Sequence, residues 1–361
     1  MKFTKSALVA TMVAATLTLS ACGSDSPSDS GAPTGATSDL AGSLKASGSS
    51  AQKNAIQEWI NAFQTANPGV TVDYQANGSG AGIKDFINKQ TAFAGSDSAL
   101  KEDEAAEAAA RCVAGPAINI PMVGGAIALT YNLEGVDSLT LTPAVAAGIF
   151  TNKITKWNDA AIAAINPGVK LPNASIAQFH RSDSSGTTDN FTKWLIAAAP
   201  DAYTLEGGKD WVAEGGQGAK GSDGVASSVK STPNSIGYVE LSFVQTMGLK
   251  AAKVDNGGGA VEATSETAAK TIAGATIKGT GNDLALSVDR TIADGQSYPI
   301  VLVTYEITCE KGLSADELKL VKAFLTYTAS DEAQSMLSSI GYVPISGDLL
   351  TKVRAAVAAI S

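Results

Sequence analysis

Residues 70–87 read Val-Thr-Val-Asp-Tyr-Gln-Ala-Asn-Gly-Ser-Gly-Ala-Gly-Ile-Lys-Asp-Phe-Ile, and this stretch decides the expected fold class. Val70 and Val72 alternate with polar residues, which is the period of a half-buried strand. A glycine-rich loop follows, and Ile83 and Phe86 then recur at helical spacing. A strand that runs into a helix through a short loop is the repeating unit of α/β proteins with parallel strands.

The sequence on both sides of this unit continues the alternation. Upstream, apolar residues from Ile56 to Phe63 recur at i, i+3, i+4 and i+7, and Ser49 and Ser50 precede them as candidate helix caps. Downstream, residues 92–95 predict a short strand, and an Ala/Glu-rich helix follows. The sequence therefore predicts an α/β fold with a largely parallel sheet.

The later sequence repeats these signals and suggests a second lobe. We expect a helix from Pro143, a strand over residues 300–304, and a further helix that the capping box of Ser314 and Glu317 opens. A chain of 361 residues is long for a single hydrophobic core. The expected lobes are residues 45–119 with 300–361, and residues 120–299, joined by a hinge near residues 119 and 299.

The first 44 residues predict export and anchoring. Lys2 and Lys5 precede an apolar stretch that is too short for an easy membrane span, so residues 1–21 are interpreted as a signal peptide. The ending Leu-Ser-Ala-Cys resembles a bacterial lipobox, which predicts a lipid anchor on Cys22 at the outer face of the cell membrane. A simple cleaved signal is the alternative. Residues 22–44 are rich in Ser, Gly, Pro and Asp, and they predict a flexible linker.

Charge and cysteine content limit the possible functions. The chain has 26 Lys and Arg against 35 Asp and Glu, a net charge of −9, which argues against nucleic-acid binding. An anionic ligand must then be held by local dipoles and donors. Cys112 and Cys309 remain besides Cys22, and in an exported protein they predict a disulfide. A metal site or thiol nucleophile lacks partner residues, since His180 is the one histidine.

Residues 181–187, Arg-Ser-Asp-Ser-Ser-Gly-Thr, suit an oxyanion. A loop between a strand and a helix presents free backbone N–H groups, and Arg181 adds a guanidinium fork. Two further loops that open helices carry hydroxyls, Ser49-Ser50 and Gly78-Ser79-Gly80. The alternative is that each is an ordinary Ser/Gly turn. If lobe closure brings them together, they would surround a small anion.

Asp97 indicates which oxyanion the site would bind. A carboxylate repels an anion unless the anion carries a proton to donate, and phosphate near neutral pH still carries one. Sulfate carries none, so an acceptor carboxylate would select phosphate. Taken alone, Asp97 is better explained as the N-cap of the helix that follows. Asp183 is expected to orient Arg181 by ion pairing, with a local turn as the alternative.

At these residues the mature chain resembles the phosphate-binding proteins of the ABC phosphate importer. The resemblance implies a two-lobed periplasmic-binding-protein fold of type II, with a hinge and the ligand in the cleft between lobes. It implies a monomeric binding protein that passes phosphate to membrane permease subunits, with no catalysis, cofactor or metal. The motifs that carry it lie at residues 48–51, 74–80, 93–97, 154–159, 181–187, 218–225, 235–240 and 341–344.

The family's ligand contacts fall on matching residues of this sequence, with one departure. Many members have Thr-Phe where this chain has Ser50-Ala51, which keeps the hydroxyl but changes the cleft lining. The resemblance assigns phosphate contacts to Ser50, the N–H of Ala51, Ser79, Asp97, Arg181, Ser185, Gly186 and Thr187.

Other functions stay open at this point. Ser50-Ala51-Gln52-Lys53 fits the S-x-x-K pattern of penicillin-recognising serine enzymes, but their Ser-Asp-Asn and Lys-Thr-Gly partner motifs are missing from the sequence. A capped helix with an exposed Lys53 explains the pattern equally well. The ligand could also be sulfate or molybdate, and phosphate binding could serve sensing or adhesion.

Overall fold

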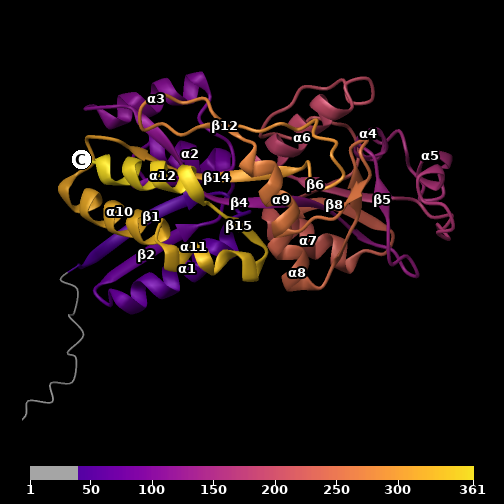
Figure 1. Cartoon of the computed structure of the whole chain (residues 1–361), viewed down its shortest axis with the longest axis horizontal. Coiled ribbons are helices and arrows are strands. Elements are labelled where there is room, and N and C mark those ends of the chain that lie inside the picture. The colour runs from indigo at the N-terminus through magenta and orange to yellow at the C-terminus, as the bar shows by residue number, and fades with distance from the viewer. Residues whose placement is uncertain (1–39) are drawn as a thin grey trace, which may run out of the picture. The chain divides into compact units, whose positions relative to one another are not determined.

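The long strand β4 (Ala117–Asn132) organises the computed structural model, which describes residues 40–361. Its first part pairs antiparallel with β14 (Val301–Cys309), from Ala117↔Cys309 to Ala126↔Val301. Its last six residues pair antiparallel with β8 (Ser235–Glu240). One strand thus joins two parts of a ten-stranded sheet (Figure 1). The expected signal peptide, Cys22 and most of the expected linker lie outside the described residues.

The first part of the sheet has the order β2-β1-β3-β14-β4. Strands β2 (Val70–Gln75) and β3 (Phe93–Ser96) both pair parallel with β1 (Gly42–Gly48). The short β15 (Tyr342–Pro344) pairs antiparallel with β4. The strand and helices predicted around residues 56–95 are confirmed. The connecting helices are α1 (Lys53–Ala66), α2 (Ser79–Ile87) and α3 (Glu102–Cys112).

The second part has the order β4-β8-β6-β7, in which β6 (Ala177–Arg181) pairs parallel with both β8 and β7 (Gln217–Ala219). The predicted helix at Pro143 is confirmed, with Pro143 in its first turn. The helices here are α4 (Pro143–Phe150), α5 (Ala160–Ala164), α6 (Gly186–Ala198), α7 (Gly221–Ser231), α8 (Leu241–Met247) and α9 (Ser265–Ala273). The remaining short strands are β5 (Thr140–Leu141), β9 (Lys250–Ala251), β10 (Lys253–Asp255), β11 (Ala260–Val261), β12 (Thr276–Ile277) and β13 (Leu286–Ser287).

The C-terminal helices pack against the N-terminal third of the described chain. Trp59 of α1 donates its indole N–H to the carbonyl of Ala333 at 2.9 Å, and the rings of Phe63 and Phe324 meet edge to face. The predicted capping box is confirmed, because Ser314 Oγ accepts the N–H of Glu317. These elements are α10 (Ala315–Thr328), α11 (Asp331–Ser335), a 3-10 turn (Leu337–Ile340) and α12 (Gly347–Ala359).

The sheet is mixed, whereas the sequence predicts a largely parallel one. The antiparallel pairs involve β4 and β14, which run past each other in the middle of the sheet. Both strands are apolar along most of their length, and an apolar run does not reveal strand direction. The strand predicted over residues 300–304 also continues to Cys309, because every residue of β14 is buried.

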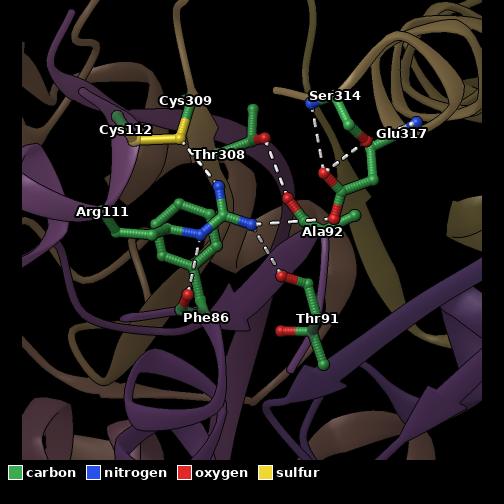
Figure 2. Close-up of a disulfide and its surroundings, with 9 residues drawn as sticks. All are labelled: Phe86, Thr91, Ala92, Arg111, Cys112, Thr308, Cys309, Ser314 and Glu317. Atoms are coloured by element: carbon green, nitrogen blue, oxygen red, sulfur yellow. Dashed lines mark hydrogen bonds and ion pairs between the residues drawn. A yellow bond between two sulfur atoms is a disulfide. The ribbon is translucent and has the colours of Figure 1, made fainter. Parts of the chain in front are cut away.

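The predicted disulfide joins Cys112, at the end of α3, to Cys309, at the end of β14. Figure 2 shows Arg111 beside this bond, with its guanidinium lying over the ring of Phe86 at 4.1 Å. Its Nε and Nη2 donate to the carbonyls of Phe86 and Thr91, and its Nη1 donates to the Sγ of Cys309. A bonded cysteine pair and a buried arginine therefore fix the C-terminal end of β14 to the first third of the chain.

Among residues 40–361, the structure contains no helix with the length and apolar character that crossing a membrane requires.

Candidate functional site

Arg181 is the last residue of β6, and the loop after it runs directly into α6. Ser185 caps this helix, since its Oγ accepts the N–H of Thr188 at 3.2 Å. The helix therefore begins at Gly186. The first backbone N–H groups of a helix lack intrahelical partners, so Gly186 and Thr187 supply donors beside Arg181.

Arg181 is buried and held by Asp183. Its Nε donates to Asp183 Oδ1 at 2.8 Å, and its Nη2 pairs with the other carboxylate oxygen. Asp183 also accepts the N–H of Gly221, the first residue of α7, at 2.9 Å. Burial by itself would raise the pKa of Asp183, but the hydrogen bonds and charge of Arg181 hold that pKa below its usual range. The guanidinium is thus fixed in place, and Nη1 donates to Thr187 Oγ1 at 3.2 Å.

Asp97 lies on the loop after β3, and its carboxylate faces Thr187 at the first turn of α6. Its Oδ1 accepts the hydroxyls of Ser49 at 2.5 Å and Thr304 at 2.8 Å, and its Oδ2 accepts Thr187 Oγ1 at 3.4 Å. Burial raises the pKa of Asp97, and the hydrogen bonds from Ser49 and Thr304 oppose that rise. Its own N–H donates to Ser79 Oγ at 3.2 Å. Residues from three distant segments therefore meet at the carboxylate of Asp97, and Ser79 meets its backbone.

The N-cap interpretation of Asp97 is wrong. Helix α3 begins at Glu102, five residues later, and the N–H of Lys101 is accepted by Glu104 in a local box. The Ala/Glu-rich sequence predicts the helix but not its first residue. The carboxylate of Asp97 is consequently available to the cluster around Arg181.

Close packing at Gly186 brings the two sides of the site together. A Cβ atom at Gly186 would lie 2.6 Å from both Asp97 Cβ and Ser79 Oγ, closer than side chains approach. Asn190 of α6 also donates to the carbonyl of Asp97 at 2.7 Å. The glycine therefore lets the start of α6 touch the loop after β3 directly.

Ser50 and Ala51 lie beside this cluster, against α7. Ser50 Oγ accepts the N–H of Ser222 at 3.0 Å. The N–H of Ala51 donates to Ser49 Oγ at 3.1 Å, and the carbonyl of Ala51 accepts the Tyr342 hydroxyl at 2.6 Å. Contact between the Ala51 N–H and a ligand stays a prediction. It would require this N–H to release Ser49 Oγ, its present acceptor.

The structure adds Ser49 and Thr304 as hydrogen-bond partners of Asp97. The sequence places Ser49 in one of the three hydroxyl-bearing loops but assigns it no ligand contact, and α1 begins only at Lys53. Thr304 lies within an apolar strand more than two hundred residues from Asp97 along the chain. Nothing in the local sequence marks Thr304. The lysine of the S-x-x-K pattern, Lys53, pairs with Asp223 at 2.7 Å and is half exposed.

The assembled groups can bind a small oxyanion that carries a proton. Arg181, the hydroxyls of Ser79 and Thr187, and the first turn of α6 are donors, while the carboxylate of Asp97 is an acceptor. Within the described part of the chain, no group of three or more His, Cys, Asp or Glu side chains is arranged to hold a metal ion.

Comparison with known proteins identifies the family to which the chain belongs. A family model described as a PBP superfamily domain matches residues 29–332. The phosphate-binding protein PstS 3 of Mycobacterium tuberculosis H37Rv is 46% identical over 365 residues, covering 98% of each chain. PstS 2 of the same strain is 41% identical over 375 residues, covering 100% of each chain.

A solved structure supports the fold. It is a phosphate ABC transporter substrate-binding protein from Clostridium perfringens with bound phosphate, and it superposes with a TM-score of 0.62 at 22% sequence identity. The match covers 84% of the present chain and 100% of that chain. The two-lobed periplasmic-binding-protein architecture expected from sequence is therefore confirmed.

Proposed function

Because the chain belongs to the PBP superfamily and, within it, to the PstS phosphate-binding proteins, we propose that it captures inorganic phosphate and delivers it to an ABC importer. The observation that carries this proposal is the meeting of one guanidinium and one carboxylate at the first turn of α6. Arg181 supplies the charge that holds the anion, and Asp97 accepts the proton that phosphate still carries.

The proposed ligand contacts are those that the resemblance assigns. Charge-assisted hydrogen bonds contribute about 1.5–3 kcal/mol each, so several of them offset the repulsion from a net charge of −9. Asp183 acts through Arg181, which it keeps oriented. The contacts come from Ser50, Ala51, Ser79, Asp97, Arg181, Ser185, Gly186 and Thr187.

The site combines residues from both proposed lobes, residues 45–119 with 300–361 and residues 120–299. Ser79 and Asp97 belong to the first and Arg181 to the second, and the hydrogen bonds that Thr187 and Asn190 of the second donate to Asp97 support closure around a ligand. The crossing strands β4 and β14 would serve as the hinge. A binding role of this kind needs no catalytic step.

We also propose that the protein acts outside the cytoplasm as a monomer, held to the outer face of the cell membrane by lipid on Cys22. The leader-like residues 1–21 and the polar linker after them support this location. Mass spectrometry of the membrane-bound protein tests it, since a diacylated Cys22 should be the first residue, and an unmodified cysteine would contradict it.

Calorimetric titration of the mature protein, stripped of endogenous anion, tests the ligand. We expect phosphate to bind at pH 7 and sulfate to give negligible heat, because sulfate brings no proton to Asp97. Asp97→Asn should reduce this discrimination. Equal heats for phosphate and sulfate in the unsubstituted protein would refute the proton-based selection, and the absence of phosphate binding would refute the function.

A further inference from the structure

The two oxygens of the Asp97 carboxylate have different surroundings. Oδ1 accepts two short hydrogen bonds, from Ser49 at 2.5 Å and Thr304 at 2.8 Å. Oδ2 has one longer contact, 3.4 Å from Thr187, on the side of Arg181. Asp97 as a whole residue is 3% exposed. Oδ1 is therefore satisfied by the protein, and Oδ2 is the oxygen turned toward the ligand groups.

The Ser49 hydroxyl can only act as a donor to Asp97. Its Oγ already accepts the backbone N–H of Ala51 at 3.1 Å and that of Gln52 at 3.4 Å. A serine hydroxyl has one proton and two lone pairs, so these bonds leave the proton for Asp97. The turn that precedes α1 thus fixes the direction of this hydrogen bond.

Thr304 is brought to Asp97 by an irregularity between β14 and β4. The pairing runs regularly to Thr304↔Val123 and resumes at Tyr305↔Pro121, so Met122 is skipped. Proline lacks an N–H for the ladder, which favours a break in pairing at this point. Bulges of this kind redirect side chains next to functional sites, and the hydroxyl of Thr304 ends 2.8 Å from Asp97 Oδ1.

The charge of Arg181, on β6, favours the ionised form of Asp97, but its contribution is smaller than that of the two hydroxyls, and Asp183 already pairs with the guanidinium. Burial and the charge of Asp97 raise the pKa of Glu306, on β14, to about 8. Burial is also the main cause that raises the pKa of Glu240, at the end of β8, and of Tyr74, on β2. The hydrogen bonds from Ser49 and Thr304 are the largest of the contributions that oppose the effect of burial on the pKa of Asp97.

We infer that Ser49 and Thr304 determine ligand specificity by holding Asp97 ionised, with Oδ2 presented as the proton acceptor. This inference rests on the proposed function and adds two residues that act through Asp97 without touching the anion. A carboxylate stripped of these donors would become protonated more easily. A protonated Asp97 is a donor, and it would accept sulfate as readily as phosphate.

The test is the ratio of phosphate to sulfate affinity, measured by calorimetry from pH 5 to pH 9 on the mature protein. In the unsubstituted protein the ratio should fall at acidic pH, where Asp97 protonates. Ser49→Ala and Thr304→Val each remove a donor, raise the pKa of Asp97, and so move this fall to higher pH. At pH 7 the ratio should drop about tenfold in the double variant, since a hydrogen bond to a charged group is worth at least that factor.

Matched controls separate this effect from general damage to the fold. Thr308→Val removes a buried hydroxyl from the same strand, where it donates to the carbonyl of Ala92. Ser47→Ala removes a hydroxyl that donates to a different carboxylate, Asp85, at 2.7 Å. Both variants should keep the affinity ratio of the unsubstituted protein at pH 7 and the pH at which that ratio has fallen halfway. Thr304→Ser, which retains the donor, should do the same.

Three results would overturn the inference. The first applies if the unsubstituted protein binds phosphate and rejects sulfate. It is an unchanged affinity ratio, falling at an unchanged pH, in Ser49→Ala, Thr304→Val and their combination. The second is an equal shift in Thr308→Val, which would make the effect one of packing. Absence of phosphate binding in the unsubstituted protein is distinguishable from both, and it would refute the proposed function together with this inference.

Discussion

Arg111 and Arg181 are both buried, yet their guanidinium groups donate to different kinds of acceptor. Arg111, in the disulfide corner with Cys112 and Cys309, donates to two backbone carbonyls and a bonded sulfur (Figure 2). Arg181, in the ligand corner with Asp97 and Thr187, donates to the side chains of Asp183 and Thr187. Backbone carbonyls stay where the fold puts them, whereas side chains can rotate and exchange partners.

This difference shows how a buried arginine can be assigned a role. The carbonyl partners of Arg111 close a network within the fold, and burial lowers the pKa of Arg111 while Glu317, 3.9 Å away, opposes that change. Arg181 keeps one nitrogen on a hydroxyl that also contacts Asp97. We therefore interpret Arg111 as structural and Arg181 as ligand-binding.

The largest expected effect is on ligand affinity. Arg181→Ala should weaken phosphate binding about a thousandfold, because it removes two or more charge-assisted hydrogen bonds to the anion. Calorimetric titration measures the change, and circular dichroism checks that the protein is still folded. A folded variant with unchanged phosphate affinity would end the distinction between the two arginines.

The reciprocal substitution should act on stability. Arg111→Ala leaves the buried carbonyl of Thr91 without its donor, removes one of the donors to the carbonyl of Phe86 and opens a void over the Phe86 ring, so we expect the free energy of unfolding to fall by about 4 kcal/mol. Denaturant titration measures this loss. The folded fraction should bind phosphate with unchanged affinity, and a binding defect at full folding would place Arg111 in the ligand corner instead.

Removing the disulfide should have a somewhat smaller effect of the same kind. The double variant Cys112→Ser with Cys309→Ser should lose about 3 kcal/mol of unfolding free energy, typical for a native disulfide. Phosphate affinity should stay within about twofold, since distant sites are usually independent. A much larger loss of affinity would indicate that the two corners are coupled.

The smallest effect concerns Glu306, which lies on β14 between the two corners. Burial raises its pKa from 4.5 to about 8, so the folded protein retains a proton that the unfolded chain releases, and stability falls as pH rises through this range. Glu306→Gln should therefore be more stable than the unsubstituted protein by about 2 kcal/mol at pH 6, and equally stable at pH 4. Thermal unfolding at the two pH values measures the difference, and an equal gain at both would exclude titration as its cause.

Local sequence predicted those parts of the fold that are set by local chemistry. The periodic apolar residues of α1, the capping box at Ser314 and the glycine-rich start of α2 all specify structure within a few residues. The motif at residues 181–187 likewise predicted a strand, a turn and a helix N-terminus. The sequence also predicted that Ser79, Asp97 and Arg181 would lie together, and the structure brings them together.

The remainder depends on contacts that local sequence does not encode. Strand direction in β4 and β14 is set by which apolar strands meet, so the mixed sheet was not foreseen. The N-cap alternative for Asp97 is wrong because α3 begins only at Glu102, and helix boundaries depend on capping details that composition does not reveal. Thr304 reaches Asp97 through a pairing irregularity with β4, which only the assembled sheet creates.

The position of β14 has a consequence for synthesis of the protein. This strand lies between β3 and β4 in the sheet, but most of the chain precedes it in the sequence. Until residues 301–309 are present, β3 and β4 each have an unpaired edge, and such edges recruit other chains. Completion of the sheet must therefore wait for the C-terminal part of the chain, and truncated products should be substrates for chaperones or proteases rather than functional fragments.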